Sequence, residues 1–281
     1  MWRVDPPPHQ ADYVARECVA TIRDRNLRRR VKDGESDLLN NSRILTKAAS
    51  DETTWRLFPN HFSDLELRPE QWKWLYERML RSKRGRAVYD ELLVRPSPNR
   101  CPYCGFGYIS TIDHYLPKDS YYQLSIEPLN LIPCCADCNH KKSNEQASGP
   151  GSQYLHPYFV EESFQWLVCK IDPNSPPAMS FEVACHNTSI SSVLRERLQH
   201  QFQALKLNER FIVQAGPLLN QLSVQLKRNF KNVPTSAVSD WLSEQAETWR
   251  ESDPNSIGGA LCTGLARSRW YCDGGYLGYP W

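Results

Sequence analysis

The stretch that decides the fold of this chain is CPYCGFGYISTIDHYLPKDSYYQLSIEPLNLIPCCADCNHKK, residues 101–142. It contains two CxxC pairs, Cys101 with Cys104 and Cys135 with Cys138. A CxxC turn points two thiolates at one ion, and four thiolates suit tetrahedral Zn²⁺. Cys134 adjoins the second pair, but the spacing favours Cys135 as the ligand. A zinc ion with four thiolates has no open position, so it should brace the structure while neighbouring residues carry any chemistry.

The rest of the chain has the composition of an ordinary globular protein. It has 281 residues, 40% hydrophobic and 23% charged, with a formal net charge of +2, so nucleic acid would have to bind through local basic patches. The beginning, MWRVDPPPHQ, lacks the apolar run of a secretory signal. No segment approaches the ~18 apolar residues of a membrane span. We therefore expect a cytoplasmic protein with no membrane partner, whose six other cysteines are buried apolar residues rather than disulfides.

Hydrophobic periodicity predicts a mainly α-helical α+β fold in three regions. Residues 1–95 are expected to be helical, with the stretch from Pro69 to Leu93 placing an apolar stripe on one face. Residues 96–150 form the zinc-braced core. Residues 151–281 are mainly helical, with a β-hairpin expected at 164–185 because two strand-like runs flank the turn former DPNSPP.

Polar residues stand out between and beside the cysteine pairs. Asp113 and His114 follow the strand-like run YISTI, and Asn130 precedes an apolar pair. Asn139 and His140 come directly after the last cysteine, at the start of a short helix that carries Lys141 and Lys142. Adjacent strand residues point to opposite sides, so Asp113 and His114 can serve one site only if the strand ends or bends there.

The segments CPYC, IDHYLPK and PLNLIPCCADCNHKK together resemble the HNH endonuclease family. The resemblance covers about 45 residues and implies a ββα-metal fold, in which two antiparallel strands and a helix surround one catalytic divalent ion. A CxxC zinc site often braces this core in the family. The chain departs from the family at KDSYYQLSIEP, where many members have a glycine-rich turn. The departure affects the expected conformation of this loop and leaves the expected metal ligands unchanged.

The resemblance also implies a role for each polar residue. Asp113 takes the position of the metal-binding aspartate and His114 that of the general base. Asn130 corresponds to the middle asparagine, for which we expect a hydrogen-bonding role. Asn139 takes the last metal-ligand position, where its amide oxygen suits Mg²⁺ or Mn²⁺; His140 replaces it if the register is off by one. Four basic residues are predicted to contact nucleic acid: Lys118, His140, Lys141 and Lys142.

These roles predict an endonuclease that hydrolyses DNA with a catalytic Mg²⁺ or Mn²⁺ and a structural zinc. Two alternatives remain open: an HNH enzyme that cleaves RNA, and a non-catalytic zinc module that binds nucleic acid or a protein. The variant of the motif, with HPYF at 156–159, is similar to HNH proteins of bacterial phage-defence systems. Some of those act beside a partner ATPase, as in Septu-type systems, which implies antiphage defence and such a partner here.

Overall fold

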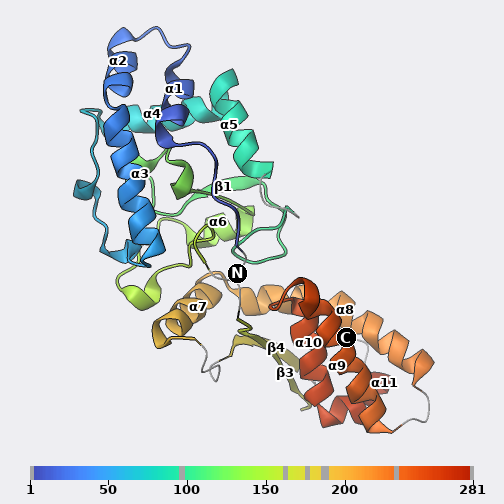
Figure 1. The fold of residues 1–281 in the computed structure, drawn as a ribbon. Helices are drawn as coiled ribbons and strands as arrows, with labels where there is room; N and C mark the ends of the chain where they lie inside the picture. The colour runs from blue at the N-terminus through green and yellow to red at the C-terminus, as the bar shows by residue number, and fades with distance from the viewer. Residues whose placement is uncertain are drawn as a thin grey trace. The chain divides into compact units, whose positions relative to one another are not determined.

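The computed structural model describes residues 3–94, 99–160, 164–174, 178–184, 190–230 and 234–278. The chain forms two compact units, Met1–Glu162 and Ser163–Trp281 (Figure 1). The sequence predicted three regions, whereas residues from the first two share one unit and one hydrophobic core. The boundary predicted at 95/96 falls among residues 95–98, which lie outside the described residues.

Five helices make up the beginning of the first unit: α1 (Ala11–Val19), α2 (Arg25–Asp33), α3 (Glu35–Ser50), α4 (Pro69–Arg81) and α5 (Lys83–Val94). Helix α1 packs against each of the other four. The buried core that they form also includes Ile112, Ile126 and Leu131 from the segment between the cysteine pairs. The N-terminal helices are therefore part of the body that carries the cysteines.

Helices α4 and α5 occupy the stretch where the sequence predicted one helix. Proline is at the first position of α4, where its missing N–H costs nothing, and the buried residues Trp72, Leu75, Tyr76 and Met79 follow helical spacing. The helix ends at Ser82, whose backbone is extended (φ −79°, ψ 146°) and whose hydroxyl accepts a hydrogen bond from Gly85 N at 3.1 Å. A Cβ at Gly85 would lie 2.7 Å from the carbonyl oxygen of Arg78, so this close crossing requires glycine. Capping by Ser82 explains the break that periodicity alone did not reveal.

The segment between the cysteine pairs forms a small antiparallel sheet followed by a helix. Strand β1 (Thr111–His114) pairs with β2 (Leu131–Cys134), with Asp113 opposite Ile132 and His114 opposite Leu131. Helix α6 (Ala136–Lys142) packs on β1, and α5 packs on both strands. Short helices occur in this unit at η1 (Thr54–Arg56), η2 (Pro59–His61), η3 (Tyr122–Leu124), η4 (Pro128–Asn130) and η5 (Pro150–Ser152).

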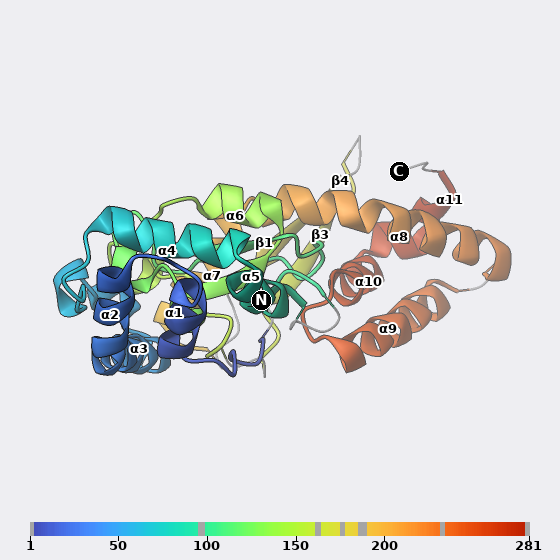
Figure 2. The same ribbon diagram turned by 90° about the horizontal axis from the view of Figure 1, so that it is seen from above.

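The second unit packs helices on a β-hairpin. Strands β3 (Leu167–Asp172) and β4 (Ala178–Val183) pair antiparallel within the range predicted for the hairpin; residues 175–177 of its turn and Cys185 lie outside the described residues. The remaining elements are α7 (Ser192–Ala204), α8 (Leu207–Asn229), α9 (Thr235–Ser252), α10 (Ile257–Arg267), η6 (Tyr271–Gly275) and α11 (Tyr276–Gly278). Helices α9 and α10 lie side by side (Figure 2). Among the described residues, no helix combines the length and apolarity needed to cross a membrane.

Candidate active site

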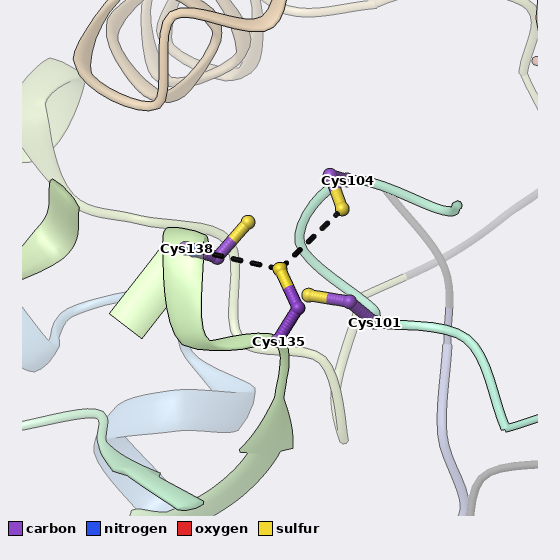
Figure 3. Close-up of side chains that lie close together, drawn as sticks. All are labelled: Cys101, Cys104, Cys135 and Cys138. Carbon is purple, nitrogen blue, oxygen red and sulfur yellow. Dashed lines mark hydrogen bonds between the residues drawn. The ribbon is translucent and has the colours of Figure 1, made fainter. Parts of the chain in front are cut away.

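Four buried cysteines gather their sulfur atoms at one point of the first unit (Figure 3). The Sγ atoms of Cys101, Cys104, Cys135 and Cys138 all lie within 4.8 Å of one another, and those of Cys104 and Cys135 are 3.9 Å apart. With Zn–S bonds of about 2.3 Å, two sulfurs of a tetrahedral zinc site lie roughly 3.8 Å apart. The cluster therefore fits the structural zinc that the spacing predicts.

The local sequence explains why these four sulfurs meet. The first pair lies on a turn closed by a 2.7 Å hydrogen bond from Gly105 N to Cys101 O, and Gly105 adopts the left-handed conformation (φ 77°) that glycine tolerates best. The Sγ of Cys135 caps α6 by accepting from Cys138 N at 3.4 Å. Cys134 instead ends β2, where it pairs across the sheet with Thr111. Cys135 is thus the cluster member, as its spacing predicts.

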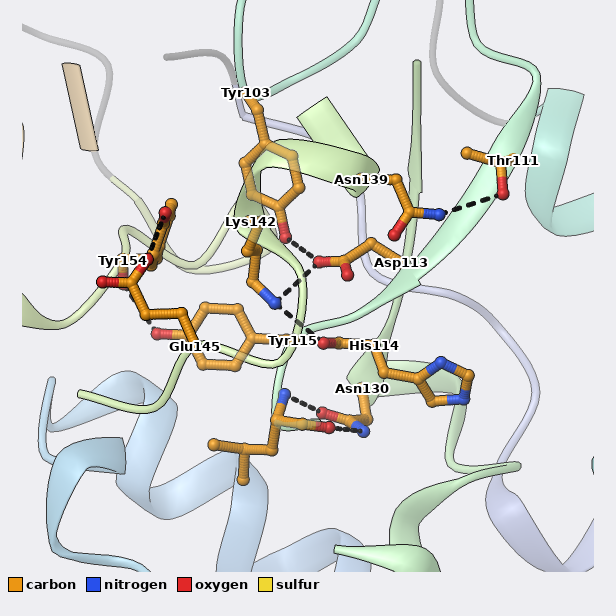
Figure 4. A network of polar contacts seen from close by, with 11 residues as sticks. Tyr103, Thr111, Asp113, His114, Tyr115, Asn130, Asn139, Lys142, Glu145 and Tyr154 are labelled. Atoms are coloured by element: carbon orange, nitrogen blue, oxygen red, sulfur yellow. Dashed lines mark hydrogen bonds and ion pairs between the residues drawn. The ribbon is translucent and has the colours of Figure 1, made fainter. Parts of the chain in front are cut away.

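Asp113, His114 and Asn139 line one cavity of about 350 Å³. Side chains of the N-terminal helices, Tyr76 from α4 and Tyr89 from α5, line its other walls. Strand β1 ends at His114, which is how two neighbours that leave the strand in different directions both border the same cavity. Figure 4 shows the carboxylate of Asp113 and the amide oxygen of Asn139 facing one another beside α6, while the imidazole of His114 points away from both.

The imidazole of His114 is buried and held from two sides. Its Nε2 lies 2.9 Å from the carbonyl oxygen of Ser125, and since a carbonyl only accepts, Nε2 carries the hydrogen. Tyr76 packs against the ring edge-on, with centroids 4.7 Å apart. Burial lowers the pKa of His114 to about 3, so the ring is neutral at pH 7 with Nδ1 as its acceptor. The ring is therefore in the neutral form that a general base needs, but its pKa lies below the operating pH that such a base ideally matches.

The carboxylate of Asp113 is buried but compensated. Its Oδ2 accepts a 2.9 Å hydrogen bond from the hydroxyl of Tyr103 and lies 3.0 Å from Nζ of Lys142. Burial raises the pKa of Asp113, while the Lys142 ammonium and the Tyr103 hydrogen bond oppose that shift. Both donors approach the same oxygen.

Asn139, on the first turn and a half of α6, turns its amide oxygen toward Asp113 (Figure 4). Its Nδ2 donates to Oγ1 of Thr111 at 3.1 Å, which fixes which end of the amide faces the carboxylate. One carboxylate oxygen and one amide oxygen are the hard donors that Mg²⁺ and Mn²⁺ prefer. These residues therefore fit a divalent cation.

Asn130 lies away from these oxygen donors, fully buried behind the loop that follows β1. Its Oδ1 accepts from Leu116 N at 2.7 Å, and its Nδ2 donates to the carbonyl oxygens of Leu116 at 3.0 Å and Leu124 at 3.2 Å. Three hydrogen bonds from one side chain thus tie both ends of the loop that leads from His114 toward Ser125.

The four basic residues predicted to contact nucleic acid have different surroundings. Lys118 lines the cavity, with its Nζ 4.7 Å from the ring centroid of Tyr76. His140 is exposed and Lys141 half-buried on α6. Lys142 departs from the prediction: it is 1% exposed, and its Nζ donates to the carbonyl oxygen of His114 at 2.9 Å while pairing with Asp113. An ammonium enclosed in this way does not face a phosphate in solvent.

Sequence reasoning missed four residues of the site, two that bond to its polar side chains and two that line the cavity. Tyr103 lies inside the first cysteine pair, so its position in a zinc turn was the available signal. Thr111 precedes Asp113 by two residues, and the period of a strand places both side chains on one face. No comparable signal existed for Tyr76 and Tyr89, which reach the cavity from helices that precede the motif.

Comparison with known proteins places this site in a family. Residues 101–145 match the family model described as HNH endonuclease, so this segment of the chain carries an HNH endonuclease domain. The matched range contains all four cysteines of the cluster together with Asp113, His114 and Asn139.

Two curated relatives share part of the chain. Protein ea31 of Escherichia phage lambda is 35% identical over 158 residues, which is 54% of this chain and 53% of that protein. Septu protein PtuB of Bacillus thuringiensis is 35% identical over 68 residues, 22% of this chain and 26% of that protein. The chain thus spans about half the length of the first relative and about a quarter of the second. No solved structure matches it.

Proposed function

We propose that this chain, through its HNH endonuclease domain at residues 101–145, hydrolyses the phosphodiester bonds of DNA in a reaction that depends on a divalent cation. In this proposal β1, β2 and α6 are the ββα-metal core. The observation that carries it is that Asp113, His114 and Asn139 all line one cavity of a unit that also holds a cysteine cluster fitting zinc.

His114 is the general base of the proposed reaction. Its Nδ1 takes a proton from a water molecule whose oxygen forms a new bond to phosphorus, while the bond from phosphorus to the 3′-oxygen breaks and that oxygen takes a proton from solvent. The products are a 5′-phosphate and a 3′-hydroxyl end. The hydrogen bond from Nε2 to Ser125 O keeps the ring in the orientation and tautomer that the transfer needs.

Asp113 and Asn139 are the proposed ligands of Mg²⁺ or Mn²⁺. When bound there, the cation polarises the scissile phosphate and offsets charge on the departing oxygen. Lys118 lines the same cavity and is the basic residue best placed to contact the substrate backbone. Exposed His140 and half-buried Lys141 are proposed to extend that contact along α6.

The decisive experiment compares the wild-type protein with His114→Ala on plasmid DNA, single-stranded DNA and tRNA, with and without Mg²⁺. We expect Mg²⁺-dependent cleavage of DNA that falls roughly 10²- to 10⁴-fold in the variant, since general-base catalysis has that magnitude. His61→Ala, at an exposed histidine outside the cavity, is the matched control and should cleave as the wild type does.

The other outcomes separate the alternatives. Cleavage of tRNA alone would move the assignment to RNA and leave the enzyme class in place. If no substrate is cut, or if cutting persists without a divalent cation and in His114→Ala, the hydrolytic proposal fails. A non-catalytic zinc module would then remain.

We further propose a role in antiphage defence, together with a partner ATPase. Its support is the similarity to Septu protein PtuB, which extends over 68 residues. Expression of the chain with its neighbouring genes should lower phage plating efficiency, and His114→Ala should restore it. Equal plating with both forms would remove the defence assignment without touching the nuclease proposal.

A further inference from the structure

Lys142 is a buried ammonium in contact with the candidate catalytic carboxylate. It is 1% exposed and among the largest fully buried side chains of the described residues. Its Nζ lies 3.0 Å from Asp113 Oδ2 and 2.9 Å from the carbonyl oxygen of His114, and the ring of Tyr154 lies 5.8 Å away (Figure 4). Removing an ammonium from water is costly unless it is well paired, so this geometry is closely specified.

Tyr103 reinforces the same contact from the opposite direction. Its hydroxyl donates to Asp113 Oδ2, the oxygen that Lys142 also binds. The two donors arrive from different sides of the cysteine cluster: Tyr103 from the turn between Cys101 and Cys104, and Lys142 from the helix that Cys135 caps. Both partners of Asp113 Oδ2 therefore come from segments that the cysteine cluster holds.

This arrangement sets the charge that a cation would meet. Asp113 contributes one negative charge, which the Lys142 ammonium 3.0 Å away balances, and the amide of Asn139 carries no charge. Lys118 also lines the cavity, and its charge is offset by the neighbouring Asp119, whose Oδ2 lies 2.8 Å from Nδ2 of the cavity residue Asn144. A divalent cation entering the free protein thus meets no net negative charge, whereas a phosphodiester would bring both a negative charge and further oxygen ligands.

We propose that Lys142 and Tyr103 are positioning residues which neutralise Asp113, so that the catalytic cation binds firmly only together with a phosphodiester. The inference rests on the proposed nuclease function and adds an order of events to it. The free protein would then hold no catalytic cation until a phosphodiester enters the cavity. Because coupling between two ligands is reciprocal, the cation must raise the affinity for DNA by the same factor.

The test measures Mn²⁺ binding to zinc-loaded His114→Ala, in which cleavage is expected to be roughly 10²- to 10⁴-fold slower, with and without a short DNA duplex. Free Mn²⁺ is followed by its electron paramagnetic resonance signal. We expect the affinity for Mn²⁺ to rise on the order of 10- to 100-fold when the duplex is present. The affinity for the duplex should rise by the same factor when Mn²⁺ is added. Equal affinity for Mn²⁺ with and without DNA would overturn the inference.

Lys142→Met in the same background tests the charge argument on the free protein. Without the ammonium, the negative charge of Asp113 is not balanced, so Mn²⁺ should bind the free protein at least several-fold more tightly. Adding the duplex should then increase the affinity for Mn²⁺ by a smaller factor. Lys32→Met, at an exposed lysine of α2, is the control and should leave Mn²⁺ binding unchanged. Should Lys142→Met fail to fold, Tyr103→Phe keeps the ring and removes one donor from Oδ2, with a smaller increase expected. Unchanged or weaker Mn²⁺ binding in the folded variant would refute the role of the pair.

Failure here is distinguishable from failure of the proposed function. If the wild type cuts DNA with Mg²⁺ but Mn²⁺ and DNA do not affect each other's binding, only this inference is refuted. If the wild type cuts nothing, the nuclease proposal is refuted, while the Mn²⁺ titration of Lys142→Met still tests the charge balance at Asp113.

Discussion

Replacing Asn130 with alanine should destabilise the first unit far more than the loss of an amide usually does. The side chain is fully buried and forms three hydrogen bonds, at 2.7, 3.0 and 3.2 Å, with backbone groups of Leu116 and Leu124. Each hydrogen bond contributes about 1 kcal/mol net, and the backbone groups left behind have no access to water at this site. The three together give a loss of about 3 kcal/mol.

That loss converts into a measurable change in melting temperature. For domains of about 150–250 residues, 1 kcal/mol shifts Tm by roughly 2–4 °C, so Asn130→Ala should melt about 6–12 °C lower. Differential scanning calorimetry of the zinc-loaded protein is the assay, and the transition that moves when zinc is chelated identifies the unit with the cysteine cluster. Asn144→Ala is the matched control, because Asn144 is exposed and its Nδ2 bonds to Asp119 at 2.8 Å on the surface; its Tm should stay within about 2 °C.

The loop that Asn130 holds joins His114 to Ser125, so the proposed nuclease activity of Asn130→Ala should fall along with its stability. The reasoning is refuted if Asn130→Ala melts within about 2 °C of the wild type. The three hydrogen bonds would then have to be replaceable, by water or by a shift of the loop.

Three further predictions concern the cysteine cluster, a buried histidine and the orientation of a ligand. A Cβ at Gly107 would lie 2.8 Å from Cys135 Sγ, so Gly107→Ala should release zinc faster to a colorimetric chelator, whereas Gly149→Ala, with no atom within 4 Å, should not; equal release rates would contradict this. Burial lowers the pKa of His156 to about 3, so between pH 6.5 and 3 the unfolded chain binds the extra proton and stability is lost as the pH falls. Between pH 7.5 and 5.5, the free energy of unfolding measured with urea should therefore fall by about 1 kcal/mol less in His156→Phe than in the wild type. An equal fall in both proteins would contradict this prediction. Thr111→Val removes the acceptor of Asn139 Nδ2 and should raise the Mg²⁺ concentration for half-maximal cleavage roughly 10-fold, while Thr111→Ser, which keeps the acceptor, should not; identical Mg²⁺ curves would exclude this orienting role.

Regular residue spacing was sufficient to predict part of this structure from the sequence. The interval of two residues within each cysteine pair places both sulfurs on one turn, and the four sulfurs do gather, with Cys135 rather than Cys134 among them. Helical periodicity likewise identified the buried face of Pro69–Arg81. The end of that helix at Ser82 was missed, because a single serine cap interrupts the backbone without interrupting the hydrophobic pattern.

The sequence by itself determined which side chains share a turn, a strand face or the first turn of a helix, since those relations depend on residues a few positions apart. It therefore indicated the cysteine cluster and the neighbourhood of Asp113, His114 and Asn139. Only the tertiary structure decided that Lys142 is buried against Asp113, because the partner of that ammonium lies 29 positions earlier in the chain and is brought to it by the packing of α6 on β1. The walls contributed by Tyr76 and Tyr89 were decided in the same way: burial depends on what the whole chain packs together, and no local spacing encodes it.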